Sequence, residues 1–379
     1  MSNPIYLDCN ATTPVAHEVL DAMLPWLRDQ HGNPSSTHPY GRRAAQAVAT
    51  ARQQVATLIG AQPAEIVFTG CATESNNLAV MGVAEALAPG RRHIVVSAVE
   101  HPAVMAPAVA LRDRGWEVTV VSVDEFGRVS LGQFERSLRA DTALVSVMHA
   151  NNEVGTMQPI REIAALTRPR GIVLHTDAAQ SAGKVALDVN DLGVDLLTLA
   201  GHKFYAPKGI GALYVRSGTP IRPMLRGAGQ EHGLRPGTEN VAAIVALGAA
   251  AALAVSSLDG TARHLRAMRD RLHARLATGI SDLVLNGHPE HRLPNTLHVS
   301  FPGVSGRALL AAADTVAASV GSACHSEDDA VSGVLAAMGV NTARAVGAVR
   351  LSVGRMTAAE EIDRAADALV AAWKQLRAL

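Results

Sequence analysis

Short apolar runs alternate with longer amphipathic stretches along most of the chain. Apolar runs rich in β-branched residues and leucine are typical of buried strands, and they occur at 65–69, 93–97, 117–121, 143–147, 172–176, 196–199 and 212–216. Between them, apolar positions spaced as on one helix face predict helices, among them 42–59, 74–87, 102–114 and 160–168. This alternation predicts an α/β fold with a largely parallel sheet and helices on both of its faces.

The pattern changes in the last third of the chain, which predicts a second domain. The expected elements there are a buried helix over 241–255, too short to span a bilayer, an arginine-rich helix over 258–276, strands near 297–301, 319–322 and 349–353, and a final helix over 358–376. A chain of 379 residues also exceeds what one core usually holds. We therefore expect a large domain over 15–255 and a small α+β domain formed by 1–14 and 256–379.

Composition narrows the class of protein. Lys and Arg number 34 together, as do Asp and Glu, so the formal net charge is zero, and aromatic residues make up only 3%. Proteins that bind nucleic acids or membrane surfaces directly need a basic excess, so neither partner is expected. The three cysteines form no disulfide framework, the first residues do not resemble a signal peptide, and no Cys/His cluster has metal-ligand spacing. We expect a cytoplasmic protein without a bound metal.

Two turns that follow predicted strands carry polar residues suited to binding a charged ligand. The turn 69–75, Thr-Gly-Cys-Ala-Thr-Glu-Ser, combines small residues with a helix N-terminus, which attracts an anion such as phosphate. An ordinary helix cap at Thr73 explains the same residues. Asp177 ends an apolar strand, where it could pair with a protonated ring nitrogen or cap the next helix. The residues alone leave these alternatives open.

Lys203 and Cys324 are the candidate reactive side chains. Lys203 directly follows a buried strand and a Gly-His pair, so we expect a partly desolvated amine with a lowered pKa, which favours imine formation. Most lysines lie on the surface instead, and Lys208 in the same loop fits that interpretation better. Cys324 stands between small and polar residues, which predicts an exposed, nucleophilic thiol. The alternative is a buried inert cysteine, the interpretation that suits Cys9 and Cys71.

Together these stretches resemble the class-V aminotransferase family, and specifically the cysteine desulfurases of the nitrogen-fixation and iron–sulfur housekeeping type. The similarity runs from Tyr6 almost to the C-terminus. The segments that carry it are Tyr-Leu-Asp-Cys-Asn-Ala-Thr-Thr-Pro at 6–14, Gly-Asn-Pro-Ser-Ser at 32–36, Ala-Thr-Glu-Ser at 72–75, Val-Glu-His-Pro-Ala-Val at 99–104, Ala-Asn-Asn-Glu-Val-Gly-Thr at 150–156, His-Thr-Asp-Ala-Ala-Gln at 175–180, Gly-His-Lys at 201–203, Arg-Pro-Gly-Thr-Glu-Asn at 235–240, Arg-Leu-Pro-Asn-Thr at 292–296, Gly-Ser-Ala-Cys at 321–324 and Val-Arg-Leu-Ser-Val-Gly-Arg at 349–355.

The resemblance implies a fold-type-I homodimer that uses pyridoxal 5′-phosphate to convert L-cysteine to L-alanine. Sulfur would pass as a persulfide on Cys324 to an acceptor protein. Lys203 would hold the cofactor and shuttle protons, while His101 would stack on its ring. The other implied roles are pairing with the ring nitrogen (Asp177) and the ring oxygen (Gln180), phosphate binding (Ala72, Thr73, His202 and the partner's Thr238), and orientation of the substrate carboxylate (Asn10, Asn152 and Arg350).

The chain departs from the family pattern at three places. Ala200 stands where many relatives carry a serine that donates to the phosphate, and Cys9 where a polar residue is more usual. Cys-His-Ser at 324–326 is also similar to the selenocysteine lyases, which makes a selenocysteine lyase on the same site the main alternative. A transaminase of the same fold and a non-catalytic scaffold for sulfur relay are further alternatives. The sequence does not identify the acceptor, which could serve iron–sulfur assembly, tRNA thiolation or DNA phosphorothioation.

Overall fold

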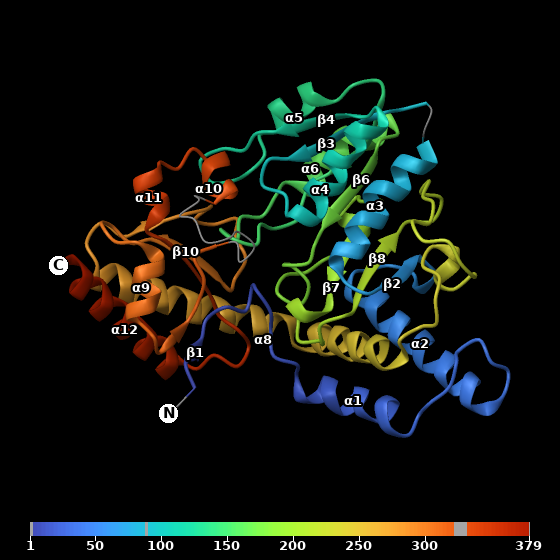
Figure 1. The fold of residues 1–379 in the computed structure, drawn as a ribbon, viewed down its shortest axis with the longest axis horizontal. Coiled ribbons are helices and arrows are strands. Elements are labelled where there is room, and N and C mark those ends of the chain that lie inside the picture. Colours follow the sequence, from blue (N-terminus) through green and yellow to red (C-terminus); the bar gives the residue numbers. More distant parts are fainter. Residues whose placement is uncertain (1–2, 88–89, 322–331, 379) are drawn as a thin grey trace.

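The computed structural model describes residues 3–87, 90–321 and 332–378, and these form two parts built on separate sheets (Figure 1). We call the part with seven strands the large domain. Its strands are β2 (Ile66–Thr69), β3 (His93–Ser97), β4 (Glu117–Val121), β5 (Thr142–Ser146), β6 (Val173–Asp177), β7 (Leu196–Ala200) and β8 (Gly211–Val215). Its helices are α1 (His17–Arg28), α2 (Pro39–Leu58), α3 (Ala72–Leu87), α4 (Pro102–Ala110), α5 (Leu131–Ser137), α6 (Ile160–Thr167) and α7 (Val189–Leu192).

The large sheet has the strand order β2-β8-β7-β6-β5-β3-β4. All of its strands run parallel except β8, which is antiparallel to both neighbours. In the register of the sheet, Asp177 at the end of β6 lies beside Thr198 of β7. Parallel strands bring their carboxyl ends to one edge, so the turns that follow β6 and β7 lie next to each other there.

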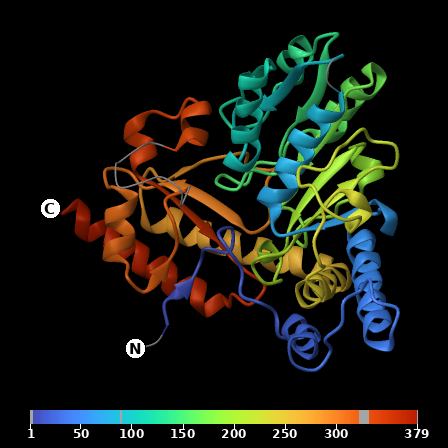
Figure 2. The same cartoon turned by 45° about the vertical axis from the view of Figure 1, so that its right-hand side comes forward.

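Helices cover both faces of this sheet (Figure 2). On one face, α3 and α4 contribute Val83 and Val104 to a buried apolar cluster that includes strand residues such as Val96. On the other face, α2 and α6 contribute Val55 and Ile163 to a second cluster. Because strands buried on both faces consist of continuous apolar runs, this two-sided packing explains why the sequence pattern located them.

The small domain lies beside the large one and draws on both ends of the chain (Figure 1). Leu7, Leu272 and Leu369 share its buried apolar core. One antiparallel sheet has the order β12-β10-β9, and β1 pairs in parallel with β11. The elements are β1 (Ile5–Tyr6), β9 (Val284–Leu285), β10 (Thr296–Ser300), α9 (Gly306–Ala312), β11 (Val316–Ala317), α10 (Gly333–Ala337), α11 (Thr342–Val346), β12 (Ala348–Ser352) and α12 (Ala359–Arg377).

Helix α8 (Val241–Gly279) belongs to both domains. It is one continuous helix of 39 residues, so the two helical stretches predicted on either side of residue 255 are joined. Its first half gives Leu247 to the large core, and its second half gives Leu272 to the small core. The helix is long and apolar enough to cross a membrane by length and composition, but half of its apolar window is buried inside the protein, as in a core helix.

The expected α/β fold, with a mostly parallel sheet between helices, is confirmed, whereas the residue bounds predicted for the two domains stay a prediction. The strand expected at 319–322 is wrong for the described part of that range. The short strand there is Val316–Ala317, and Ser319 forms only an isolated bridge with Arg350. Gly321 has φ +124°, a conformation that does not continue a strand.

Candidate active site

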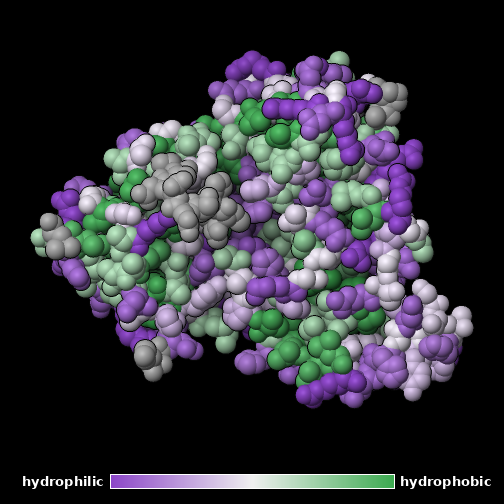
Figure 3. All heavy atoms as spheres, viewed as in Figure 1, coloured by the Kyte–Doolittle hydropathy of each residue, from purple (hydrophilic) through white to green (hydrophobic). Residues whose placement is uncertain are grey.

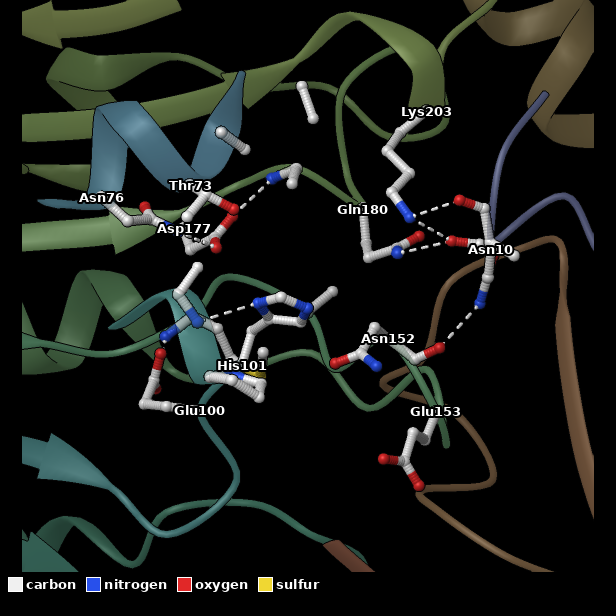
Figure 4. Close-up of a pocket in the computed structure, with 18 of the residues that line it drawn as sticks. Asn10, Thr73, Asn76, Glu100, His101, Asn152, Glu153, Asp177, Gln180 and Lys203 are labelled. Atoms are coloured by element: carbon white, nitrogen blue, oxygen red, sulfur yellow. Dashed lines mark hydrogen bonds between the residues drawn. The ribbon is translucent and has the colours of Figure 1, made fainter. Parts of the chain in front are cut away.

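A cavity of about 230 Å³ lies where the small domain meets the carboxyl edge of the large sheet. Figure 4 shows its side chains converging from several separate elements. Most of the residues singled out in the sequence line this one cavity: Asn10, Ala72, Thr73, His101, Asn152, Asp177, Gln180, Lys203 and Arg350. Residues that are far apart in the chain therefore meet at a single site.

The carboxylate of Asp177 is fixed at one wall of the cavity by two hydrogen bonds. Its Oδ2 accepts from Nδ2 of Asn76 over 2.6 Å, and its Oδ1 accepts from the backbone N–H of Ala179 over 2.9 Å (Figure 4). Asn76 lies on α3 three residues after Thr73, on the same helix face. The carboxylate is therefore aimed into the cavity and capable of pairing with a cationic ring nitrogen.

The amine of Lys203 approaches the cavity from the turn that follows β7. Its Nζ donates to the backbone oxygens of Asn10 and Ala11 over 2.6 and 2.8 Å. Nε2 of Gln180, from the turn that follows β6, donates to the same oxygen of Asn10 over 3.0 Å. Figure 4 shows the two side chains pointing at this oxygen from one side. Lys203 and Gln180 are thus held together against the segment that joins the two domains at the N-terminus.

His101 and Glu100 form another part of the wall. His101 caps α4, where its Nδ1 accepts from the backbone N–H of Ala103 over 3.1 Å. Burial lowers the pKa of His101, so the neutral ring with its proton on Nε2 is favoured. Glu100 accepts at Oε1 from Ser97 and from the backbone N–H of Met148. Burial raises the pKa of Glu100 to about 8, so at neutral pH this carboxyl adds no full negative charge.

The small domain contributes a cation to the cavity. Arg350 on β12 donates through Nη1 to the backbone oxygen of Asn152 over 3.0 Å and through Nη2 to Asp8 over 2.8 Å. Its buried Nε has no partner among the described residues. Asn10 also donates to the backbone oxygen of Asn152, over 3.2 Å, and to Thr296. A guanidinium so held can receive a carboxylate.

The predicted phosphate ligands are only partly brought together. Ala72 and Thr73, at the N-terminus of α3, line the cavity, and so does Ala200. His202 is not among the lining residues. Its Nδ1 lies 3.2 Å from Oγ1 of Thr12, and burial, with the nearby charge of Lys203, lowers its pKa to about 4. Thr238 is exposed in the segment between β8 and α8. Its expected role in a partner subunit stays a prediction, and Cys324 lies outside the described residues.

The residues that line the cavity fit pyridoxal phosphate. The amine of Lys203 suits an aldehyde, the Asp177 carboxylate suits a protonated pyridine nitrogen, and the α3 N-terminus suits a phosphate. Two buried oxygens, Oδ1 of Asn76 and Oε1 of Gln180, also have no hydrogen-bond partner among the described residues. Buried polar atoms normally have partners, so unpaired atoms lining a cavity indicate a site shaped for a polar ligand.

Three polar side chains that line the cavity, those of Asn76, Glu100 and Glu153, were not assigned a role from the sequence. Asn76 and Glu100 adjoin residues that were, one helix turn beyond Thr73 and directly before His101, and this spacing is the signal that could have found them. Glu153 is a buried acid that lines the cavity and accepts from the hydroxyl of Ser332. It stands in the family segment 150–156, but its partner lies far along the chain, so the sequence did not assign it a role.

Comparison with known proteins gives one family. The model of class-V aminotransferases matches residues 5–365. The curated cysteine desulfurase IscS of Dictyoglomus turgidum is 43% identical over 381 residues, which covers 100% of this chain and 97% of that protein. The sequence similarity therefore extends over the whole chain, including the segments that line the cavity.

Solved structures agree with the sequence matches. A NifS-like protein, 37% identical, superposes with a TM-score of 0.92 over 99% of this chain and 100% of its own. The structure described as SspA in complex with cysteine, 36% identical, has a TM-score of 0.83 and covers 93% of this chain and 99% of that one. Both comparisons confirm the resemblance and the fold-type-I class inferred from the sequence motifs.

Proposed function

Since the chain belongs to the class-V aminotransferase family, and within it to the cysteine desulfurases, we propose that it converts L-cysteine to L-alanine with pyridoxal phosphate. The observation that carries this proposal is the presence of Lys203, Asp177 and Arg350 around one cavity. An amine for the cofactor aldehyde, a carboxylate for its ring and a guanidinium for an amino acid carboxylate are together the groups that such a reaction needs.

The cofactor would be held by Lys203, with Asp177 facing its ring nitrogen and Gln180 its ring oxygen. When bound, pyridoxal phosphate draws electrons away from the Cα of an amino acid substrate. The Nζ of Lys203 is the group placed to move protons at that Cα. The neutral ring of His101 offers a flat surface at the cavity, while Arg350 and Asn152 orient the substrate carboxylate.

We assign the sulfur-accepting step to Cys324. An S–S bond forms between its thiolate and the substrate sulfur while the substrate's Cβ–S bond breaks. The electron pair of the broken bond stays with Cβ, which takes up a proton and becomes the methyl group of alanine. The sulfur remains on Cys324 as a persulfide until a second thiol, from an acceptor protein or an added reductant, removes it.

The proposal includes a homodimer in the cytoplasm. Figure 3 shows apolar residues gathered on the face over α1, where Leu20 and Leu27 are 45% and 61% exposed. Apolar patches of this kind mark interaction surfaces. Thr238 is exposed as well, which suits its expected reach into a neighbouring subunit. An odd number of scattered cysteines supports a reducing compartment.

The test compares purified wild-type protein with Cys324→Ala in L-cysteine and a reducing thiol, and measures the alanine and sulfide formed. Cys71→Ala is the matched control. The burial expected for Cys71 is wrong, since this cysteine is exposed, and it lies outside the set of lining residues. We expect equal turnover by wild type and Cys71→Ala, with turnover by Cys324→Ala reduced at least roughly a hundredfold, since no other proposed group replaces the nucleophile.

The outcomes separate the alternatives. If wild-type protein binds pyridoxal phosphate but releases no alanine from cysteine, the proposal fails. Rapid turnover of selenocysteine that survives Cys324→Ala would identify a selenocysteine lyase instead. Alanine formation that requires a keto acid would identify a transaminase.

A further inference from the structure

Lys184 lies directly behind the cavity wall, in the turn that follows β6. Its side chain is almost fully buried, and the residue is 3% exposed. The Nζ donates to the backbone oxygen of Lys203 over 3.1 Å and to that of Gln180 over 2.9 Å. These are the two residues expected to contact the cofactor through Nζ and the side-chain amide. One buried amine therefore connects the turns that carry both of them.

The packing of this turn fixes where Lys184 lies. Gly183 has φ +71°, and a Cβ there would lie 3.1 Å from the Cβ of Phe204, the residue after Lys203. The positive φ and the close approach both favour glycine. The backbone N–H of Lys184 donates to Ser181 over 3.0 Å. Lys184 is thus held from its own turn and from the turn that carries Lys203.

The charged and titratable groups that act on the Lys184 amine are Lys203, His202 and Cys9. Burial, followed by the charge of Lys203, lowers the pKa of Lys184 to about 7. Burial also lowers the pKa of His202, to about 4, and raises that of the Cys9 thiol to about 12. The imidazole and the thiol are therefore neutral near pH 7, so the charged group that acts on the Lys184 amine is Lys203.

The choice of lysine at this position is informative. The chain has only four lysines, Lys184, Lys203, Lys208 and Lys374, among 34 basic residues. An arginine stays charged at any pH that a protein meets. A lysine amine can lose its charge and still keep two N–H groups, enough for the two carbonyl oxygens. Lys184 can therefore keep both hydrogen bonds whether or not it carries a proton.

We propose that Lys184 is a positioning residue for the cofactor site, which ties the backbone of Lys203 to that of Gln180 and disfavours the charged form of the Lys203 amine. Two ammonium groups in one buried region repel each other, so a proton on either amine makes a proton on the other less favourable. An uncharged Lys203 amine is the form that reacts with an aldehyde. The inference deepens the proposed function and rests on it for the role of Lys203.

The test measures the protonation of Lys203 directly. The full-length chain, freed of cofactor, is labelled with a trace of acetic anhydride at a series of pH values, and acetylation of Lys203 is quantified by mass spectrometry. In Lys184→Met the midpoint of this labelling should rise by about one pH unit, because one repelling charge is gone. Affinity for pyridoxal phosphate should fall roughly tenfold, because two buried carbonyls lose their donor.

Lys208→Met is the matched control, since Lys208 is an exposed lysine in the same loop, and it should leave both values unchanged. Lys184→Gln keeps a donor without a charge, so its midpoint should rise as in Lys184→Met while its affinity falls less. A folded Lys184→Met protein with wild-type midpoint and affinity would overturn the proposal. If Lys184→Met does not fold, an unchanged labelling midpoint in folded Lys184→Gln would overturn the proposal. Neither the labelling midpoint nor the cofactor affinity depends on cysteine turnover. A failure of the desulfurase proposal can therefore be told apart from a failure of the Lys184 proposal.

Discussion

Arg350 and Asp8 form an ion pair that joins the start of the chain to β12 at the edge of the cavity. Nη2 of Arg350 lies 2.8 Å from Oδ1 of Asp8, and the two side chains are 4% and 19% exposed. Solvent and salt screen such a pair weakly. The guanidinium proposed to receive the substrate carboxylate therefore already shares its charge with a carboxylate of the protein.

Asp8→Asn should lower the KM for L-cysteine, because Arg350 would then meet the substrate with its full charge. The asparagine oxygen can still accept from Nη2, so the position of the guanidinium is kept. Steady-state kinetics over a range of cysteine concentrations measures the effect. Arg350→Lys is the comparison, and it should raise the KM roughly tenfold or more, since an ammonium cannot bind a carboxylate in the bidentate way. A higher KM in both variants would mean that Asp8 serves only to hold the arginine.

Asp177→Asn should weaken binding of pyridoxal phosphate while leaving the shape of the site intact. A hydrogen bond to a charged group contributes about 1.5–3 kcal/mol, so we expect affinity to fall roughly ten- to a hundredfold. Equilibrium dialysis of the cofactor measures this. Asp195→Asn makes the same change at the opposite end of the neighbouring strand, where Asp195 accepts from the backbone N–H of Leu174, and it should keep wild-type affinity. An equal loss in both variants would point to general destabilisation.

Glu100→Gln should make the stability of the protein less sensitive to pH between 4.5 and about 8. Burial raises the pKa of Glu100 from 4.5 to about 8, so between these values the carboxyl is protonated when folded and ionised when unfolded. Its contribution to stability is therefore full below pH 4.5 and is lost as the pH rises through 8. The glutamine is neutral throughout and keeps an oxygen for the backbone N–H of Met148.

Thermal unfolding midpoints of wild type and Glu100→Gln at both ends of this pH range give the comparison. The midpoint of the wild type should fall more than that of the variant as the pH rises. Glu125→Gln is the matched control because Glu125 is exposed, and it should follow the wild type. Parallel curves for all three proteins would show that Glu100 is ionised in the folded state.

Arg52→Leu should destabilise the large domain strongly. Arg52 and Glu231 form an ion pair of 2.6 Å with side chains 14% and 3% exposed, and Glu231 also accepts from the backbone N–H of Phe68. Removing the arginine leaves a buried carboxylate without its cation, at a cost of about 3–5 kcal/mol. Denaturant unfolding measures the loss. Arg161→Leu breaks a pair whose side chains are 70% and 73% exposed, and it should cost less than about 1 kcal/mol. Similar losses of stability in Arg52→Leu and Arg161→Leu would contradict the claim that the buried Glu231 needs its cation.

The sheet and most of the site could be predicted from the sequence for a physical reason. Strands buried on both faces must be apolar from end to end, so runs such as 93–97 are visible without an alignment. The polar residues that follow them, Asp177 and Lys203, then fall at one edge because the strands are parallel. In contrast, α1 was not predicted. Val19 is its one fully buried residue, while the apolar Leu20 and Leu27 are exposed, so its burial does not follow its apolar positions.

Residues whose role depends on distant contacts could not be found in this way. Lys184 has no feature in the local sequence that singles it out, and its burial and its hydrogen bonds to the oxygens of Gln180 and Lys203 are what place it behind the site. Asp8 and Arg350 meet across most of the length of the chain. The sequence resemblance predicts that Arg350 binds the substrate carboxylate, but no local pattern indicates that Asp8 already pairs with it.

The length of α8 has a consequence for how the cavity selects its ligand. At 1.5 Å per residue, its 39 residues form a rod of about 58 Å. Both halves of this rod are embedded, one in each core, so a change in the angle between the domains would require the rod to bend or part of a core to open. The span between Lys203 in one domain and Arg350 in the other is therefore set before a ligand arrives. Because the separation of Lys203 and Arg350 is fixed, the enzyme would select amino acids by the distance between their amine and their carboxylate.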